Sequence, residues 1–134
     1  MRVKYMIEQG MPFVTHGRTH MGVEHPYVDF DNHAFARISA ECLPSLGRTR
    51  LSLLAPPAVL SFHDHTRQGF EAAIAERGLE EVRFEGISND SSIEQIRLAV
   101  RKLVLQNPAP DGLISSSVGV SGTARALLAI QAGV

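Results

Sequence analysis

The chain of 134 residues has one cysteine, no tryptophan and no apolar run long enough to cross a membrane. A single cysteine excludes an intramolecular disulfide, and a transmembrane helix needs about 18 or more apolar residues in succession. The basic N-terminus also lacks the apolar core of a secretory signal, so we expect a cytoplasmic protein. A net charge of −1 argues against general binding of nucleic acid or of membrane surfaces by this segment alone.

The composition is that of an ordinary globular domain. Apolar residues make up 44% of the chain and charged residues 20%, which gives no sign of disorder. A chain of this length is one domain by size and can bury roughly two thirds of the surface that its unfolded form exposes. The sequence therefore allows a sizeable apolar core.

Segments typical of strands and helices alternate along the chain. The expected strands are Pro12 to Thr15, Tyr27 to Phe30, Leu51 to Ala55, Val82 to Phe84 and the run GLISSS from Gly112. The expected helices are a first one to about Gln9, His33 to Leu46, Phe62 to Arg77, one capped by Ser91 or Ser92, and Gly122 to Gln131.

The helix expected from His33 has an apolar stripe and a proline near its end. Its inward residues should be Phe35, Ile38, Cys42 and Leu46, which lie three or four positions apart. Cys42 on that stripe is expected to be a small buried side chain. Pro44 should distort the last turn or end the helix near Leu43, because proline lacks a backbone donor.

The alternation predicts an α/β fold with a parallel sheet and helices on both faces, because crossover connections between parallel strands are short and right-handed. In such sheets ligands bind beyond the carboxyl ends of the strands. In this chain those ends are residues 16–18, 29–32, 55–61, 85–88 and 115–119.

Five blocks in order resemble the effector-binding region of the LacI family of bacterial transcriptional regulators. They are MPFVTHGRT, YVDFDN, LGRTRLSLLAPP, TRQGFEAAIAERGL and DGLISSSVGVSGTARALLAIQAGV, which together cover nearly the whole chain. The resemblance implies a type I periplasmic-binding-protein fold, in which a helix-turn-helix for operator DNA precedes two flavodoxin-like subdomains with a small ligand, often a sugar, between them.

The resemblance also implies that this chain holds only part of that plan. Residues 1–17 would end the leading half of the first subdomain, residues 18–26 would form the crossover, and residues 27–134 would form most of the second subdomain. No segment of the chain resembles the helix-turn-helix, so we expect an incomplete copy of the family plan.

Ligand contacts follow from the resemblance only at matching positions. Thr66 stands where the family has an arginine, three residues before the pair Gly69 and Phe70, and Ser117 with Val118 replaces an Asn-Asp pair. Arg67 is one place later, about 100° round the helix. These departures indicate an effector chemistry different from that of the better-known sugar repressors, or a site that is partly lost. The expected effector-binding residues are Asp64, Thr66 and Ser117, followed by Arg18, Asp31 and His63.

Several of these positions also have a purely structural explanation. Asp31 and Asn32 are typical of a helix N-cap. Arg18 could do no more than occupy a hinge turn, and Ser115 and Ser116 could simply be small residues where a strand ends close to a helix. The sequence leaves these alternatives open.

Metal binding and catalysis have weaker support. The chain has six histidines, but neither His16 with His20 nor His63 with His65 has the third ligand that zinc requires. The segment VSGTA around Ser121 lacks the G-x-S-x-G spacing of a nucleophile elbow, and no phosphate-binding motif occurs. We expect no catalytic residue, no metal and no cofactor.

The sequence thus predicts the effector-sensing domain of a LacI-type regulator that is not an enzyme. Its expected partners are a small-molecule effector, a second copy of itself in a homodimer, and operator DNA through a helix-turn-helix outside this chain, with no membrane partner. Two alternatives stay open. One is a solute-binding protein of the same fold, which the missing export signal disfavours, and the other is a small α/β enzyme that uses the histidines.

Overall fold

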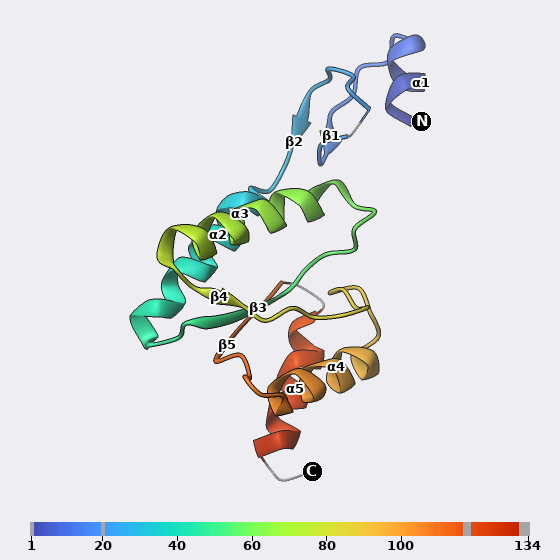
Figure 1. Cartoon of the computed structure of the whole chain (residues 1–134). Coiled ribbons are helices and arrows are strands. Elements are labelled where there is room, and N and C mark those ends of the chain that lie inside the picture. Colours follow the sequence, from blue (N-terminus) through green and yellow to red (C-terminus); the bar gives the residue numbers. More distant parts are fainter. Residues whose placement is uncertain (1, 20, 117–118, 132–134) are drawn as a thin grey trace. The chain divides into compact units, whose positions relative to one another are not determined.

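The computed structural model describes residues 2–19, 21–116 and 119–131, in which helices and strands alternate (Figure 1). Within these ranges the elements in chain order are α1 (Arg2–Glu8), β1 (Thr15–His16), β2 (Tyr27–Val28), α2 (Asn32–Cys42), the 3-10 helix η1 (Leu43–Leu46), β3 (Arg50–Leu54), α3 (Ser61–Arg77), β4 (Glu80–Glu81), α4 (Ile93–Leu105), β5 (Gly112–Ser115) and α5 (Gly119–Gln131). No helix in the described part of the chain is both long and apolar enough to span a membrane.

The chain forms two compact units, Met1–Asp31 and Asn32–Val134. In the first unit β1 and β2 pair in parallel, with Thr15 opposite Tyr27 and His16 opposite Val28. The strand that begins at Tyr27 therefore lies in the first unit, although the resemblance grouped it with the residues that follow. A strand's own residues do not show which strand it will pair with, and here the partner is β1. How the two units correspond to the subdomains of the family plan stays a prediction.

The second unit confirms the predicted α/β architecture. Its sheet has the order β4-β3-β5, and all of its pairs are parallel. The helices α2 and α3 cover one face of this sheet, and α4 and α5 cover the other (Figure 1). The central strand β3 is buried on both faces from Leu51 to Leu54, as its continuous apolar run predicts.

Each face of the sheet has its own apolar core. On the α2 and α3 side, the fully buried residues include Phe70 and Leu51. On the α4 and α5 side, Leu54 packs with Ile96 and Val100 of α4. The expected cap of α4 is also confirmed, because the Ser92 hydroxyl accepts from the Gln95 backbone N–H and the Gln95 side chain accepts from the Ser92 N–H.

The inward face of α2 differs from the prediction. Its buried residues are Ala36 and Ala40, whereas Ile38 is 58% exposed and Cys42 is also exposed, so the expectation of a buried cysteine is wrong. Ala36 and Ala40 pack with Phe70 and Ala73 of α3, and Phe35 of the predicted stripe also packs against this cluster, as expected. The prediction for Pro44 is confirmed, since α2 ends at Cys42 and a 3-10 turn follows.

The contact of α2 with α3 is closest at Gly69. A Cβ atom built on Gly69 would lie 2.1 Å from the carbonyl oxygen of His33, well inside any real contact. The His33 carbonyl belongs to the backbone of α2, and a Cβ atom at position 69 would be fixed to the backbone of α3. Neither atom could move away without shifting a whole helix. Glycine is therefore required at this position by packing.

An ion-pair network joins α3 to β4. The guanidinium nitrogen Nη1 of Arg67 lies 2.6 Å from Glu81 Oε1. Its Nη2 lies 3.0 Å from Glu81 Oε2 and 2.6 Å from Glu71 Oε1. The side chains of Arg67 and Glu81 are only 16% and 13% exposed. Burial opposes the ionisation of Glu81, but the hydrogen bonds and charge of Arg67, with those of Arg83, outweigh it and hold the pKa of Glu81 below its ordinary value.

We expect Gly69→Ala to destabilise the chain. Alanine favours a helix over glycine by about 1 kcal/mol, but overpacking against a backbone costs about 1 to 3 kcal/mol and should exceed that gain. Urea unfolding should show a lower midpoint for this variant. Gln68→Ala, at the exposed neighbouring position, is the control and should change stability by less than about 0.5 kcal/mol. A more stable Gly69→Ala variant would contradict the packing argument.

We also expect an acid-sensitive contribution from Glu81. Because its pKa is lowered in the folded state, its stabilisation is present above the unfolded carboxyl pKa of about 4.3 and is lost as the pH falls through the folded value. Glu81→Gln should lower the free energy of unfolding at pH 7 by about 1 to 3 kcal/mol, and this difference from the wild type should shrink in acid.

Urea unfolding from pH 7 to pH 3 measures this effect. Glu85→Gln is the matched control, because Glu85 and its partner Lys102 have side chains that are 83% and 78% exposed. A difference between Glu81→Gln and the wild type that stays constant with pH would show that the carboxylate charge is not the cause.

Candidate functional site

The candidate site is a hollow of about 280 Å³ in the second unit, where β3 ends and α3 begins. This is the carboxyl edge of a parallel sheet, the place where the sequence predicts ligand binding. The residues that line the hollow come from β3, α3 and the segments around β4: Leu53, Ala55, Pro56, Ala58, His63, Arg67, Glu81, Arg83, Phe84, Ile87 and Ser88.

The turn between β3 and α3 places His63 at this hollow. Two prolines follow Ala55, and the Leu60 N–H donates to the Pro57 carbonyl at 3.0 Å. The helix then begins at Ser61, so that His63 lies in its first turn. Its ring atom Nδ1 lies 2.7 Å from the carbonyl oxygen of Pro56. A side chain at the start of a helix is thereby tied back to the end of the strand.

This contact determines which nitrogen of His63 carries the proton. A carbonyl oxygen only accepts hydrogen bonds, so Nδ1 must donate. In the neutral ring Nε2 is then left with its lone pair and can accept a hydrogen bond. His63, which lines the hollow, thus has one ring nitrogen that can accept a hydrogen bond.

The charged side chains at the hollow are paired with one another. Arg67 is bound by Glu81 and Glu71, and Arg83 donates from Nε to Glu81 Oε2 at 3.1 Å and lies 3.6 Å from Glu71 Oε1. Two arginines therefore face two glutamates. The Arg67 guanidinium also lies 5.6 Å from the centre of the Phe70 ring.

Asn89, which the sequence pattern does not single out, connects the neighbouring segments of this edge. Its N–H donates to the Ala55 carbonyl at 2.9 Å, and its side-chain amide donates to Ser116 Oγ at 3.0 Å. Asn89 is only 5% exposed. Its sequence context is that of an ordinary turn, and nothing in the pattern shows that this turn crosses to the end of β5. Near it, Ser115 Oγ is buried with no hydrogen-bond partner among the described residues.

The predicted residues of the second unit differ in their placement. Thr66 is 2% exposed, and its hydroxyl donates to the Phe62 carbonyl at 2.7 Å, so its side chain is engaged by its own helix. Asp64 is exposed in the first turn of α3. Ser117 lies outside the described residues. For each of these residues, and for His63, contact with an effector stays a prediction.

The predicted residues of the first unit are Arg18 and Asp31. Arg18 Nε lies 3.5 Å from Asp29 Oδ2, and the Arg18 backbone N–H donates to the same oxygen at 3.3 Å. Its guanidinium lies 5.5 Å from the centre of the Tyr27 ring. Asp31 is exposed at the end of the unit, directly before α2. The carboxyl ends of β1 and β2 thus bring together Arg18 and Asp29.

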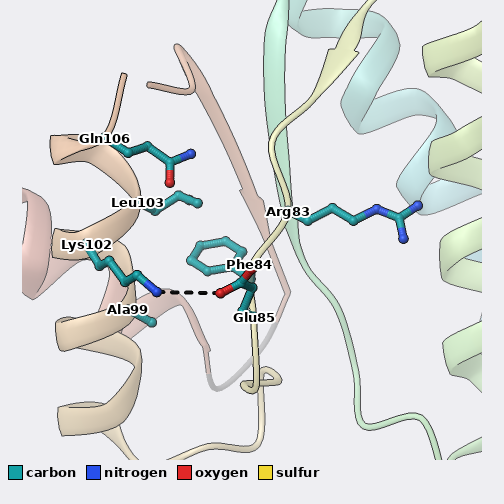
Figure 2. Close-up of a pocket in the computed structure, with 7 residues that line it drawn as sticks. All are labelled: Arg83, Phe84, Glu85, Ala99, Lys102, Leu103 and Gln106. Atoms are coloured by element: carbon teal, nitrogen blue, oxygen red, sulfur yellow. Dashed lines mark hydrogen bonds and ion pairs between the residues drawn. The ribbon is translucent and has the colours of Figure 1, made fainter. Parts of the chain in front are cut away.

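A second hollow of about 210 Å³ lies between α4 and the segment that follows β4 (Figure 2). Phe84 and Leu103 provide its apolar part, and Lys102 Nζ lies 3.5 Å from Glu85 Oε2 across its opening. Arg83 points away from the other labelled side chains (Figure 2). The Lys102 and Glu85 side chains are mostly exposed, so their ion pair contributes little to stability.

The described residues do not form a group of three or more His, Cys, Asp or Glu side chains that could hold a metal ion. His63 and His65 share the first turns of α3, but only His63 lines the hollow.

Comparison with known proteins gives a consistent result. The family described as periplasmic binding proteins and sugar binding domain of LacI family matches residues 2–131. The HTH-type transcriptional regulator AglR of Rhizobium meliloti is 31% identical over 94% of this chain and 36% of its own length. RafR of Escherichia coli, also an HTH-type transcriptional regulator, is 30% identical over 94% of this chain and 37% of its own length. The chain thus spans little more than a third of the length of these two curated relatives, both of which are transcriptional regulators.

Solved structures agree in fold. A regulatory protein of the LacI family from Chloroflexus aggregans superposes with a TM-score of 0.80 at 25% identity, over 99% of this chain and 48% of that one. The regulator CelR, solved as a cellobiose complex, superposes with a TM-score of 0.75 at 25% identity, over 96% of this chain and 40% of that one. The chain therefore belongs to the family of periplasmic binding proteins and LacI-type sugar-binding domains.

Proposed function

We propose that the chain is the effector-sensing part of a LacI-type transcriptional regulator that binds a sugar or a related small metabolite. The observation that carries this proposal is the hollow at the carboxyl edge of the second unit, which is lined by both polar and apolar side chains and includes His63. The family match and the regulator relatives AglR and RafR support it. CelR, a regulator of similar fold, binds cellobiose.

The mechanism that we propose is a shift in population between two arrangements of the sensing region. A ligand can change such an equilibrium only if it binds the two arrangements with different affinity. A difference of about 1 to 3 kcal/mol is usual for coupled sites. The residues predicted to contact the effector are Asp64, Thr66, Ser117 and His63 of the second unit and Arg18 and Asp31 of the first.

The whole regulator would act in the cytoplasm as a homodimer and bind operator DNA through a helix-turn-helix outside these 134 residues. The units Met1–Asp31 and Asn32–Val134 would belong to the first and second subdomains of the family plan.

Thermal unfolding of the chain in the presence of a panel of sugars and small acids tests the proposal. An effector at one hundred times its dissociation constant should raise the free energy of unfolding by about 2.7 kcal/mol. Asp64→Ala and Ser117→Ala should reduce this response, because each removes a polar group predicted to contact the ligand.

Glu80→Ala is the matched control, since Glu80 is an exposed carboxylate in β4, before the segment that reaches the hollow. A response that Asp64→Ala and Ser117→Ala leave unchanged would show that these residues do not contact the effector. A folded chain that responds to no compound of a broad panel would contradict the proposed function.

A further inference from the structure

The second hollow, of about 210 Å³, lies between α4 and the segment after β4 (Figure 2). Among the described residues, none of those predicted to contact the effector lines it, whereas Phe84 lines both this hollow and the candidate site. Its volume is below the range of about 300 to 1,000 Å³ that is typical of cavities for drug-sized ligands. The hollow therefore suits a compound well below that size.

One wall of the hollow is apolar and is held in place by the core. Leu103 of α4 is only 4% exposed, and Phe84 packs against the core on the α4 and α5 side while it stays half-buried. Ala99 lies four positions before Leu103, on the same face of α4. The Phe84 ring lies on the side of its segment that faces this helix (Figure 2). An apolar group of a ligand can thus cover the remaining surface of Phe84.

The rim of the hollow has one positive and one negative side chain. Lys102 Nζ lies 3.5 Å from Glu85 Oε2, and the two side chains are 78% and 83% exposed (Figure 2). Neither has another ion-pair partner among the described residues. An exposed pair of this kind contributes little to stability, so a ligand can separate it at low cost. Arg83, which also lines the hollow, points away from both (Figure 2).

These opposite charges disfavour a ligand that has only one charge. A carboxylate at Lys102 would also meet Glu85, and an ammonium group at Glu85 would meet Lys102, so attraction and repulsion nearly cancel. A zwitterion satisfies both side chains at once. An α-amino acid has its ammonium and carboxylate groups on the same carbon atom, close enough to match two side chains that lie 3.5 Å apart. Gln106, one helical turn after Lys102, adds a neutral donor and acceptor.

We propose that this hollow is a second small-molecule site, which binds a free α-amino acid with an apolar side chain of the size of leucine, methionine or phenylalanine. The ligand's carboxylate lies at Lys102 and its ammonium group at Glu85, and its side chain packs on Phe84 and Leu103. This site is additional to the proposed effector site, so its test does not depend on that proposal.

Titration of the isotope-labelled chain with L-leucine, L-methionine and L-phenylalanine, followed by NMR of the backbone amides, tests the proposal. We expect saturable shifts at the amides of Phe84, Glu85, Ala99, Lys102 and Leu103. L-leucinamide and N-acetyl-L-leucine each keep one of the two charges, and glycine lacks the apolar side chain. Each of these probes should bind at least about tenfold more weakly than L-leucine.

Variants of the rim test each charge by itself. Lys102→Gln and Glu85→Gln should keep the stability of the wild type, because both side chains are exposed, and each should weaken L-leucine binding by about tenfold. Arg101→Gln is the matched control, since Arg101 is an exposed neighbour on α4 that does not line the hollow. Lys102→Glu should abolish binding, and its combination with Glu85→Lys should restore it, because the rim then has both charges again.

Two results would overturn the recognition of a zwitterion or the position of the site. The first is L-leucinamide or N-acetyl-L-leucine binding as tightly as L-leucine. The second is an affinity for L-leucine that Lys102→Gln and Glu85→Gln leave unchanged. If none of the three amino acids shifts these amides, the proposed site is refuted. The proposed function stands or falls separately, on the response of thermal stability to the effector panel.

Discussion

The second unit depends on how closely α2 can approach α3. Gly69 allows the backbones of the two helices to meet, because any Cβ atom there would collide with the His33 carbonyl. Ala36 and Ala40 then fill the narrow space that remains. This contact holds α3 against the sheet, so that the first turn of the helix, with His63, reaches the carboxyl edge where β3 ends.

The position of α3 against the sheet also gives Arg67 a structural role beside the candidate site. From α3 its guanidinium reaches Glu81 of β4, which ties the helix to the edge strand of the sheet. The pairing also removes a free positive charge from the hollow.

Predictions from the sequence succeeded for helix ends, which depend on neighbouring residues. They failed for burial and hydrogen-bond partners that depend on segments distant in sequence. Pro44 ended α2, and Ser92 capped α4, because both effects are local. The apolar stripe predicted for α2 was only partly right, because Phe35 packs against the core while Ile38 and Cys42 are exposed, and Ala36 and Ala40 are the residues that α3 buries. Asn89 was missed because its partners Ala55 and Ser116 are far away in sequence.

Contiguous residues were enough to predict the order of strands and helices, the parallel α/β class and the family, because periodicity, helix caps and the order of sequence blocks can all be read along the chain. Tertiary structure alone decided that β2 pairs with β1, that Thr66 bonds to its own helix, and that Glu81 neutralises Arg67. These outcomes depend on distances between residues that are remote in sequence, and only packing sets those distances.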